Sequence, residues 1–464
     1  MKLSELLKNG EFTGRFAPET EITNICSHLD SCTDGSLFVA VSGSRFDGAA
    51  HISEAFSKGA KAVVTEKSIV GDNVLRCENA LSALAGICAA ENGDPQKELT
   101  LVGLTGTNGK TSTSYILSHI LNGVGIKTEV IGSVNFENTT PEPNILYSAF
   151  RRMKEDRTKA VVCEVSSQGL DQRRVDPCRF RVGEFLNFGR DHLDYHKTVT
   201  AYFESKKRLK DLSDIFIVNG DDRYASSLVS DGVKTFSVLG FADYAAKDIV
   251  LQENGSEFLI EHKDKKVPVR TGLIGMFNVY NTLAAVAAAA ELGVSLEDIA
   301  RTFDAPIVIP GRMERVFIKA PFSVYVDYAH TPQALTSALV ALRKITRGRL
   351  IVVFGCGGDR DKEKRPVMGK NAARFADEVI VTSDNPRTED PDEIIREIVA
   401  GMKDKRTPTK VICDRREAIA WAIDNAAPGD VLLLAGKGHE DYQVVGHEKH
   451  HMDEREIVAD CLKK

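Results

Sequence analysis

The chain lacks the features that mark several large classes of protein. It has no apolar run of about 18 residues, the length that a membrane-spanning helix needs. Its first residues, MKLSELLKNGEFTG, lack the apolar core of a secretory signal peptide. Its formal net charge is −6, whereas a broad nucleic-acid binder presents a basic face. We therefore expect a cytoplasmic globular protein with no membrane span and no nucleic-acid partner.

Paired cysteines are also missing. The nine cysteines are scattered singly, and none belongs to a CxxC motif. Such a set is typical of reduced thiols and not of a disulfide framework or a zinc site. Cys26 and Cys32 are the closest pair in the sequence, and we interpret them as structural. The sequence shows no internal repeat and no low-complexity segment.

Short β-like runs alternate with helical patterns along the chain, which predicts an α/β fold. The length of 464 residues corresponds to about three domains. Turn-forming residues at Asn92–Pro95 and at Ile309–Gly311 separate three sections. The predicted strands include 37–41 and 62–65 in the first section, 160–163 and 215–218 in the second, and 324–327, 350–354, 379–382 and 431–434 in the third; helices are predicted at 52–58 and 281–292.

A nucleotide-binding loop is indicated by Gly106-Thr-Asn-Gly-Lys-Thr111. It follows an apolar run at 99–104 and precedes a helical pattern at 112–121. Glycines let backbone N–H groups approach phosphate oxygens, and the N-terminus of a helix favours negative charge. Lys110 can reach the terminal phosphates, and the Thr111 hydroxyl can bind Mg²⁺. The two glycines lie closer together than in the common phosphate loop, so this loop is a variant of that form.

Charged and glycine-bearing loops follow several of the predicted strands. Glu164 ends one of them, and a carboxylate near a phosphate loop is a candidate ligand for Mg²⁺, which prefers oxygen ligands. The segment Asp191–His196 holds two aspartates and two histidines that could be metal ligands, a general base or only a polar loop. Residues 202–209 form a basic helix face, which by itself indicates only a solvated surface. In the third section such loops are Gly311–Glu314, Asp327–Pro332, Gly355–Asp361, Ser383–Arg387 and Gly436–Glu440.

These loops of the third section are hard to explain by packing alone. In open parallel sheets, ligands bind at the carboxyl ends of the strands. The loops therefore predict a cleft for anionic and zwitterionic ligands.

In their order along the chain, the motifs resemble those of the Mur ligase family, the ATP-dependent amide ligases that extend the peptidoglycan precursor in the bacterial cytoplasm. The resemblance covers nearly the whole chain. It rests on LFVA at 37–40, GTNGKTS at 106–112, NTTP at 138–141, EVSS at 164–167, GRDHLDYH at 189–196, ESKK at 204–207, GRMER at 311–315, DYAHTP at 327–332, GCGGDRDKEKRP at 355–366, SDNPR at 383–387 and AGKGHEDYQ at 435–443.

This resemblance implies three α/β domains and a reaction. Residues 1–97 would bind the UDP-muramoyl substrate, 98–310 would form a central ATP-binding domain with a P-loop-type parallel sheet, and 311–464 would form a Rossmann-like domain for the amino acid. The DNPR form is similar to that of members that add meso-diaminopimelate to UDP-N-acetylmuramoyl-L-alanyl-D-glutamate through an acyl phosphate. The implied cofactors are ATP and Mg²⁺, and the motifs themselves do not set the oligomeric state, for which we expect a monomer.

The resemblance also assigns roles to individual residues. Catalysis would fall to Lys110, His192 and Lys206, the last of which matches a lysine that is carbamylated in the family. ATP would be bound by Gly106, Thr107, Asn108, Gly109, Lys110, Thr111, Ser112, Asn278, Arg312 and Asp327. Mg²⁺ would be held by Thr111, Glu164, His192 and Lys206 as its carbamate. The muramoyl-peptide would contact Asn138, Thr139, Thr140, Ser166, Gln172 and Arg174. Diaminopimelate would contact Arg360, Asp384, Asn385, Pro386, Arg387, Gly436 and Glu440.

Two departures and several alternatives accompany this assignment. The stretch His28-Leu-Asp30 replaces the usual Asp-Ser-Arg. This leaves the uridine contacts open, with Ser27 and Ser44 as weak candidates. In addition, Gln168 replaces a usual histidine. The alternatives are the same ligase acting on L-lysine or on another diamino acid such as lanthionine, a ligase similar to folylpolyglutamate synthetase, and a nucleotide-binding protein without turnover. The proton acceptor for the incoming amine also stays open among His192, Asp191 and a carboxylate of the third section.

Overall fold

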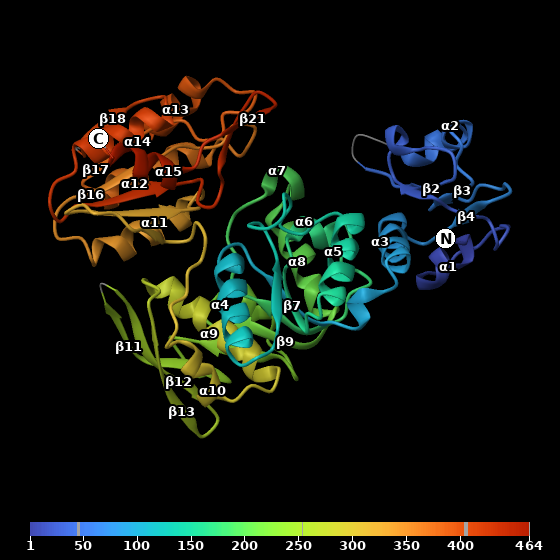
Figure 1. Ribbon diagram of the computed structural model, residues 1–464, viewed down its shortest axis with the longest axis horizontal. Coiled ribbons are helices and arrows are strands. Elements are labelled where there is room, and N and C mark those ends of the chain that lie inside the picture. The colour runs from blue at the N-terminus through green and yellow to red at the C-terminus, as the bar shows by residue number, and fades with distance from the viewer. Residues whose placement is uncertain (44–46, 253, 403–406, 464) are drawn as a thin grey trace. The chain divides into compact units, whose positions relative to one another are not determined.

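The computed structural model describes residues 1–43, 47–252, 254–402 and 407–463 (Figure 1), so that Ser44 lies outside the described residues. The chain forms two compact units, each assembled from several segments. The first unit comprises Met1–Gly106, Leu121–Phe185 and Phe203–Ile217; the second comprises Thr107–Ile120, Leu186–Tyr202 and Val218–Lys464. The predicted α/β class is confirmed, whereas the three domain boundaries stay a prediction.

The N-terminal part of the first unit is a small parallel sheet with helices packed on it. Its order is β1 (Asn24–Cys26), β2 (Ser36–Ala40), β3 (Ala62–Thr65) and β4 (Val74–Arg76). Leu37 and Val39 of β2 pack with Ile87 of α3 (Ala80–Glu91) in one core. On the other face Phe38 packs with Ala55 of α2 (Ile52–Ser57) in a second core. The predicted strands and helix of this section are thereby confirmed.

A second parallel sheet in the first unit leads into the phosphate loop. Its strands follow each other in the order β9 (Ser213–Asn219, which continues into the second unit), β8 (Phe180–Phe185), β5 (Thr100–Thr105), β7 (Ala160–Glu164) and β6 (Thr128–Ile131). Strand β5 pairs in parallel with both β7 and β8, and β6 pairs in parallel with β7. Every residue of β7 is buried, which explains why its apolar run is continuous.

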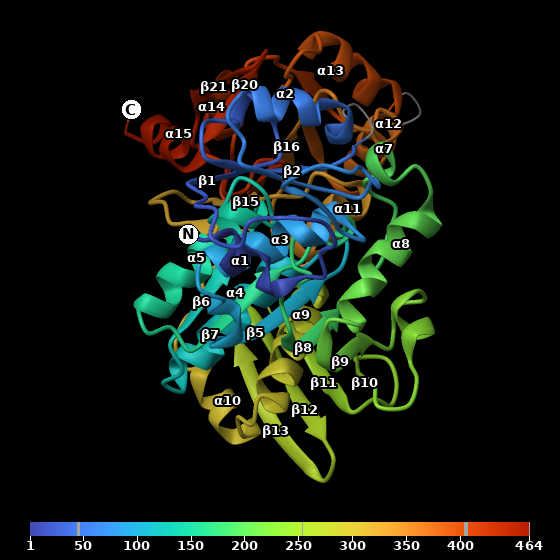
Figure 2. The ribbon, with the colours of Figure 1, turned by 90° about the vertical axis from the view of Figure 1, so that its right-hand side faces the viewer.

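In the second unit, residues 234–252 and 254–302 contain four strands and two helices. Strands β11 (Tyr244–Gln252), β12 (Gly255–His262) and β13 (Lys265–Thr271) are antiparallel, and β10 (Lys234–Ser237) runs parallel to β11. Helix α10 (Leu296–Thr302) packs beside β13 (Figure 2). The alanine-rich helix α9 (Met276–Glu291) begins five residues before the predicted start at Asn281.

The C-terminal part of the second unit is a doubly wound sheet. Its order is β14 (Glu314–Val316), β15 (Ser323–Asp327), β19 (Val431–Ala435), β16 (Leu350–Phe354), β17 (Glu378–Val381) and β18 (Thr409–Val411). All neighbouring strands are parallel except β14, which is antiparallel to β15. The carboxyl ends of the five parallel strands therefore meet at one edge, as predicted for a ligand site.

Helices cover both faces of this C-terminal sheet. Residues of α11 (Pro332–Arg343), α12 (Lys364–Phe375) and α13 (Pro391–Ala400) form one apolar core with the sheet. Residues of α14 (Arg415–Asp424) and α15 (Glu454–Cys461) form the core on the opposite face. None of the helices in the described residues combines the length and the apolarity needed to cross a membrane.

Candidate active site

The phosphate loop lies between β5 and α4 (Lys110–Gly123), so the predicted strand, turn and helix are confirmed. Gly109 has φ +88°, and a Cβ there would lie 2.5 Å from Oδ1 of Asn281, so the position requires glycine. The backbone N–H of Asn108 donates to Oδ1 of Asn187 at 2.8 Å, and Nδ2 of Asn187 donates to the Asn108 carbonyl at 2.9 Å. The N–H of Thr107 donates to the Asn187 carbonyl at 3.0 Å. Asn187 therefore shapes the loop.

Lys110 and Thr111 begin α4 beside an arginine from the C-terminal part. The Lys110 ammonium donates to the Thr107 carbonyl at 3.2 Å. Nη2 of Arg312 donates to Oγ1 of Thr111 at 3.1 Å, and the Arg312 guanidinium lies over the Tyr328 ring at 4.3 Å from its centroid. The structure thus brings together three predicted ATP-binding side chains and adds Tyr328, whose role the sequence does not reveal.

Asp327 fixes the turn that carries Arg312. Its Oδ2 accepts a 2.7 Å hydrogen bond from the N–H of Met313, which has φ +46°. Burial raises the pKa of Asp327 above its ordinary value, although the nearby Arg312 favours the charged form. The predicted residue Asn278 is buried and accepts a 3.1 Å hydrogen bond from Asn281, the residue that faces Gly109.

The His192 segment lies in the second unit between the phosphate-loop partner Asn187 and α8 (Val199–Lys207). His192 is exposed, has φ +52°, and its Nε2 lies 3.6 Å from Oδ2 of Asp191. Burial opposes ionisation of Asp191, but His192 and His330 outweigh it and lower the pKa of that carboxyl. His196 is buried against the Tyr202 ring, which indicates a packing role for this second histidine.

In the first unit, Lys206 and Glu164 are both buried, with 1% of the surface of each residue exposed. The Lys206 ammonium donates to the Gly106 carbonyl at 2.8 Å, which brings the predicted carbamylation site to the first residue of the phosphate loop. A Cβ at Gly132 would lie 2.0 Å from Oε1 of Glu164, so this glycine leaves room for the carboxylate. Among the residues that the structure describes, no three His, Cys, Asp or Glu side chains form a ready metal cluster.

The residues predicted to contact the muramoyl-peptide form one polar cluster in the first unit. Oγ1 of Thr140 donates to the Glu164 carbonyl at 2.9 Å and lies 3.1 Å from Oγ of Ser166. Nη1 of Arg174 donates to the Thr140 carbonyl at 2.5 Å, and its Nε donates to Oε1 of Gln172 at 3.0 Å. Asn138 is exposed and Thr139 half-buried in the same loop.

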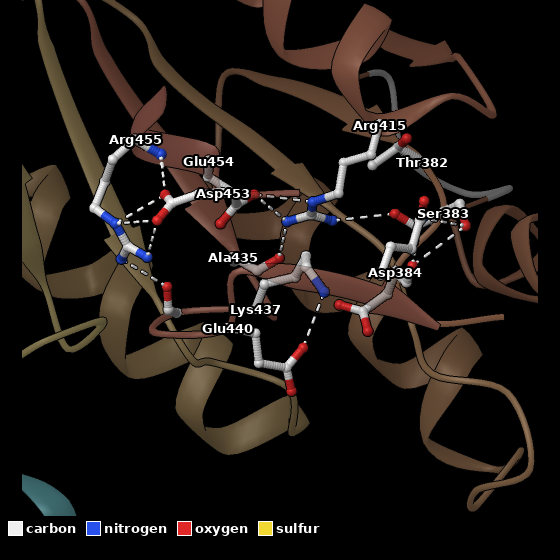
Figure 3. A network of polar contacts seen from close by, with 12 residues as sticks. Thr382, Ser383, Asp384, Arg415, Ala435, Lys437, Glu440, Asp453, Glu454 and Arg455 are labelled. Atoms are coloured by element: carbon white, nitrogen blue, oxygen red, sulfur yellow. Dashed lines mark hydrogen bonds and ion pairs between the residues drawn. The ribbon is translucent and has the colours of Figure 1, made fainter. Parts of the chain in front are cut away.

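The pocket predicted for the amino acid lies at the carboxyl ends of β16, β17 and β19. The buried Asn385 donates from Nδ2 to Oε2 of Glu440 at 2.9 Å, and its Oδ1 accepts from Nζ of Lys437 at 3.1 Å. Lys437 also forms a 2.9 Å ion pair with Glu440 (Figure 3). Lys437 is fully buried and was not among the predicted residues; its position between two glycines of a strand-end loop is the signal that could have indicated it.

Asp384 presents a carboxylate oxygen at the centre of this pocket. Its Oδ1 accepts from the N–H of Asn385 at 2.7 Å, while the buried Oδ2 has no hydrogen-bond partner among the described residues. A Cβ at Gly436 would lie 2.5 Å from this Oδ2. Burial opposes ionisation, but the charges of Lys437 and Arg415 outweigh it and lower the pKa of Asp384. The structure therefore holds a buried anionic oxygen that has no hydrogen-bond donor among the described residues.

Two arginines lie beside the glycines that follow β16. Nη1 of the half-buried Arg387 donates to the Gly358 carbonyl at 2.8 Å, and Arg387 has φ +51°. A Cβ at Gly357 would lie 2.9 Å from Nη1 of Arg387 and 3.8 Å from Cγ of the exposed Arg360. The preceding residue, Pro386, is buried, and its ring fixes the backbone angle φ of the residue just before Arg387. The predicted arginines are thus brought to the same edge of the sheet.

The family model described as Mur ligase middle domain matches residues 104–289, and that described as Mur ligase, glutamate ligase domain matches residues 311–438. The chain belongs to the Mur ligase family.

Individual relatives and solved structures resemble this chain over nearly its whole length. A UDP-N-acetylmuramoyl-L-alanyl-D-glutamate–2,6-diaminopimelate ligase from Caldanaerobacter subterraneus subsp. tengcongensis is 40% identical, with 100% of this chain and 99% of that protein covered. A protein of the same name from Synechococcus elongatus is 41% identical, with 95% and 94% covered. A solved structure of a ligase of that name has a TM-score of 0.70 at 30% identity and covers 100% of this chain and 99% of its own. The MurF ligase of Thermotoga maritima, solved with ADP, shares the fold at 22% identity with a TM-score of 0.62; 96% of this chain and 97% of that chain are covered.

Proposed function

We propose that this chain joins meso-2,6-diaminopimelate to UDP-N-acetylmuramoyl-L-alanyl-D-glutamate and converts ATP into ADP and phosphate. The full-length relatives of that name support the reaction, and membership of the Mur ligase family makes the chain a ligase that uses ATP. The observation that carries the choice of amino acid is the pocket in which Asp384 and Arg387 face neighbouring strand-end loops. The enzyme would act as a monomer in the cytoplasm during synthesis of the peptidoglycan precursor.

The chemistry must make a carboxylate react with an amine in water. A carboxylate is a poor electrophile, so an oxygen of the D-glutamyl carboxylate attacks the γ-phosphorus of ATP, and the bond from that phosphorus to the ADP oxygen breaks. The amine then attacks the acyl carbon, phosphate leaves with its oxygen, and the nitrogen loses a proton. Positioning and charge neutralisation supply most of the catalysis in such phosphoryl transfers.

The phosphate loop supplies the positive charge for the first step. Backbone N–H groups of residues 109–112, at the start of α4, suit phosphate oxygens, whereas those of Thr107 and Asn108 already donate to Asn187. Lys110 would neutralise the transferring phosphoryl group, and Arg312, fixed by Asp327, would bind a neighbouring phosphate. Asn278 would contribute through Asn281, which faces the loop glycine.

Mg²⁺ and the carbamate of Lys206 belong to the same proposal. The proposed ligands of Mg²⁺ are Thr111, Glu164, His192 and Lys206 as its carbamate. Thr111, Glu164 and a Lys206 carbamate would supply the oxygen ligands that Mg²⁺ prefers, and the carbamate would convert a buried cation into an anion. The room beside Gly132 for the Glu164 carboxylate supports this. When bound, Mg²⁺ would supply charge stabilisation to the phosphates.

The C-terminal pocket fits an amino acid that carries a carboxylate at each end. The Asp384 carboxylate, whose buried Oδ2 has no donor among the described residues, and the carboxylate of Glu440 would bind an ammonium group. The planar guanidinium of Arg387 would bind the far carboxylate. L-Lysine lacks that far carboxylate and would leave the Arg387 guanidinium without an anionic partner from the substrate.

Product analysis with purified enzyme tests the proposal. The enzyme is incubated with ATP, Mg²⁺, UDP-N-acetylmuramoyl-L-alanyl-D-glutamate and one of meso-diaminopimelate, L-lysine or lanthionine, and the product is identified by mass. We expect the mass of the diaminopimelate adduct and ADP release that depends on both substrates. Preference for lysine or lanthionine would contradict the proposed amino acid. Turnover with folate instead of the UDP substrate, or no ADP release in any mixture, would contradict the proposed reaction.

A further inference from the structure

A buried arginine joins the ends of two strands in the C-terminal sheet. Arg415 is the first residue of α14 and is only 1% exposed. Its Nη1 donates to the Ser383 carbonyl at 3.3 Å, and its Nη2 donates to the Ala435 carbonyl at 2.8 Å (Figure 3). Ser383 follows β17 and Ala435 ends β19, and β16 lies between these two strands in the sheet. One side chain thus spans three strands.

Glu454 holds Arg415 in this position. Its Oε1 accepts from Nε of Arg415 at 2.9 Å and pairs with Nη2 at 2.8 Å, and Glu454 is fully buried. Glu454 begins α15, where the helix dipole favours an anion. Arg415 begins α14, where the same dipole disfavours a cation. The helix dipoles therefore account for a glutamate at position 454 but not for an arginine at position 415.

Stability does not explain this ion pair either. Taking two charges out of water costs several kcal/mol per ion, roughly as much as the pair regains, and apolar replacements of buried pairs are often no less stable. In addition, Oε2 of Glu454 is buried without a hydrogen-bond partner among the residues described. Such an arrangement is unfavourable for packing alone, which indicates that the arginine positions other groups.

The residues after the two bound carbonyls are both in the proposed amino-acid pocket. Asp384 follows Ser383, and Gly436 follows Ala435. These two residues lie so close that a Cβ on Gly436 would come within 2.5 Å of Oδ2 of Asp384. The spacing of the two loops therefore sets the space around this buried carboxylate oxygen.

We propose that Arg415, held by Glu454, is a positioning residue that fixes the spacing between the Asp384 loop and the Gly436 loop and thereby sets the affinity for the incoming amino acid. This inference rests on the proposed function, since it takes the pocket as the amino-acid site. Arginine suits the task because its planar fork offers donors in several directions, whereas the compact ammonium of lysine cannot reach both carbonyls and Glu454 together. The positive charge of Arg415 also favours the ionised form of Asp384.

The test compares Arg415→Lys and Glu454→Gln with a control variant at the amino-terminal ends of the same strands. Arg349 links the same two strands at their other ends: its Nη1 pairs with Glu378 of β17 at 2.8 Å, and its Nη2 pairs with Asp430, just before β19, at 2.8 Å. Arg349→Lys therefore loosens the same strands away from the pocket. Steady-state kinetics with each of the three substrates are measured for the wild type and the variants, together with melting temperatures.

We expect Arg415→Lys to raise KM for diaminopimelate about tenfold, because a misplacement of about 1 Å can have such an effect, while KM for ATP and for the UDP substrate stays within about twofold. Glu454→Gln should raise the same KM by about threefold, because the arginine loses its charged partner. Arg349→Lys should leave that KM unchanged even where it lowers the melting temperature.

An unchanged KM for the amino acid in a folded Arg415→Lys enzyme overturns the proposal. The proposal is also overturned if Arg349→Lys raises this KM as much as Arg415→Lys does. If Arg415→Lys does not fold, the KM in Glu454→Gln decides by the same criterion. If the wild type does not use diaminopimelate, the proposed function fails instead, and the KM comparison is made with the amino acid that it does use.

Discussion

Glu164 of β7 and Glu184 of β8 both stand opposite Leu104, the residue of β5 that lies between them in the sheet. Since paired residues of a parallel sheet point to the same face, both carboxyls lie on one side of the strand that leads into the phosphate loop. Glu184 is fully buried, and neither of its carboxyl oxygens has a hydrogen-bond partner among the described residues. Burial raises its pKa well above the ordinary value of 4.5.

Glu184→Gln should therefore stabilise the protein more at high pH than at low pH. Below pH 4.5 the carboxyl is protonated in the folded and the unfolded chain. As pH rises, the unfolded chain releases the proton and the folded chain retains it, so wild-type stability falls by up to about 1.4 kcal/mol per pH unit until the folded pKa is reached. Glutamine removes this dependence. Melting temperatures between pH 5 and pH 8 provide the measurement, with Glu11→Gln as an exposed control; parallel curves for wild type and Glu184→Gln would refute the expectation.

Lys206 should be carbamylated, and its neighbour should not. Its ammonium is buried against the Gly106 carbonyl, whereas Lys207 is exposed and pairs with Glu204 at 3.2 Å. We expect Lys206→Ala to lose nearly all ligase activity and Lys207→Ala to keep it. Carbon-13 NMR after addition of labelled bicarbonate should show a carbamate signal in the wild type and in Lys207→Ala only. A signal of equal strength in Lys206→Ala would remove the assignment.

Lys110→Ala should abolish ADP formation without unfolding the protein. Removal of one charge-stabilising donor from a reacting group costs about 10²–10³ in rate. Lys110 is only half-buried and donates to the Thr107 carbonyl, so the melting temperature should change little. Lys154→Ala, which removes an exposed lysine paired with Glu98, is the control. Near-normal ADP release by folded Lys110→Ala would be incompatible with the phosphate-loop assignment.

Gly109→Ala should prevent nucleotide binding by steric conflict and not by backbone strain alone. Gly109 and Gly125 have similar φ values, +88° and +84°, but only Gly109 faces a close neighbour, Oδ1 of Asn281. Both substitutions strain the left-handed backbone by about 1–2 kcal/mol. Calorimetry with ADP should detect binding to wild type and Gly125→Ala, and none to Gly109→Ala. Equal losses in both variants would show that the contact with Asn281 is irrelevant.

Arg387→Ala should lower the preference for diaminopimelate over L-lysine. A site built to pair a polar group can reject an analogue lacking it by about 10⁴–10⁵, so we expect the ratio of kcat/KM values to fall by at least about 10². Arg396→Ala, an exposed arginine on α13, should leave the ratio unchanged. The idea fails if the wild type uses lysine equally well, or if the ratio in Arg387→Ala matches that in Arg396→Ala.

The buried strands of the parallel sheets could be predicted from the sequence, because strands covered on both faces are continuous apolar runs, as at Leu350–Phe354. The antiparallel strands β11–β13 were not predicted. Half-exposed residues alternate with buried ones in part of β12, and only the first three residues of β11 are buried. Charged residues in segments such as Tyr244–Gln252 weaken the apolar signal.

The phosphate loop and the arginine-bearing loops could be recognised because their chemistry is local in the sequence. Asn187 and Arg415 could not be given roles in this way, and the glycines on either side of Lys437 indicate a loop residue without revealing its partners. The partners of these three residues are 79 residues away for Asn187 and Asn108, 52 for Lys437 and Asn385, and 32 for Arg415 and Ser383. Only the folded chain shows that these side chains shape the two sites.

The bonds from Asn187 have a consequence for the thermodynamics of nucleotide binding. Two backbone N–H groups of the phosphate loop, those of Thr107 and Asn108, are already hydrogen-bonded to Asn187 within the protein. Little conformational entropy then remains to be lost at these residues when a phosphate arrives, so more of the interaction energy is expressed as affinity. The same bonds imply that these two amides exchange their hydrogens slowly with solvent before any nucleotide is present.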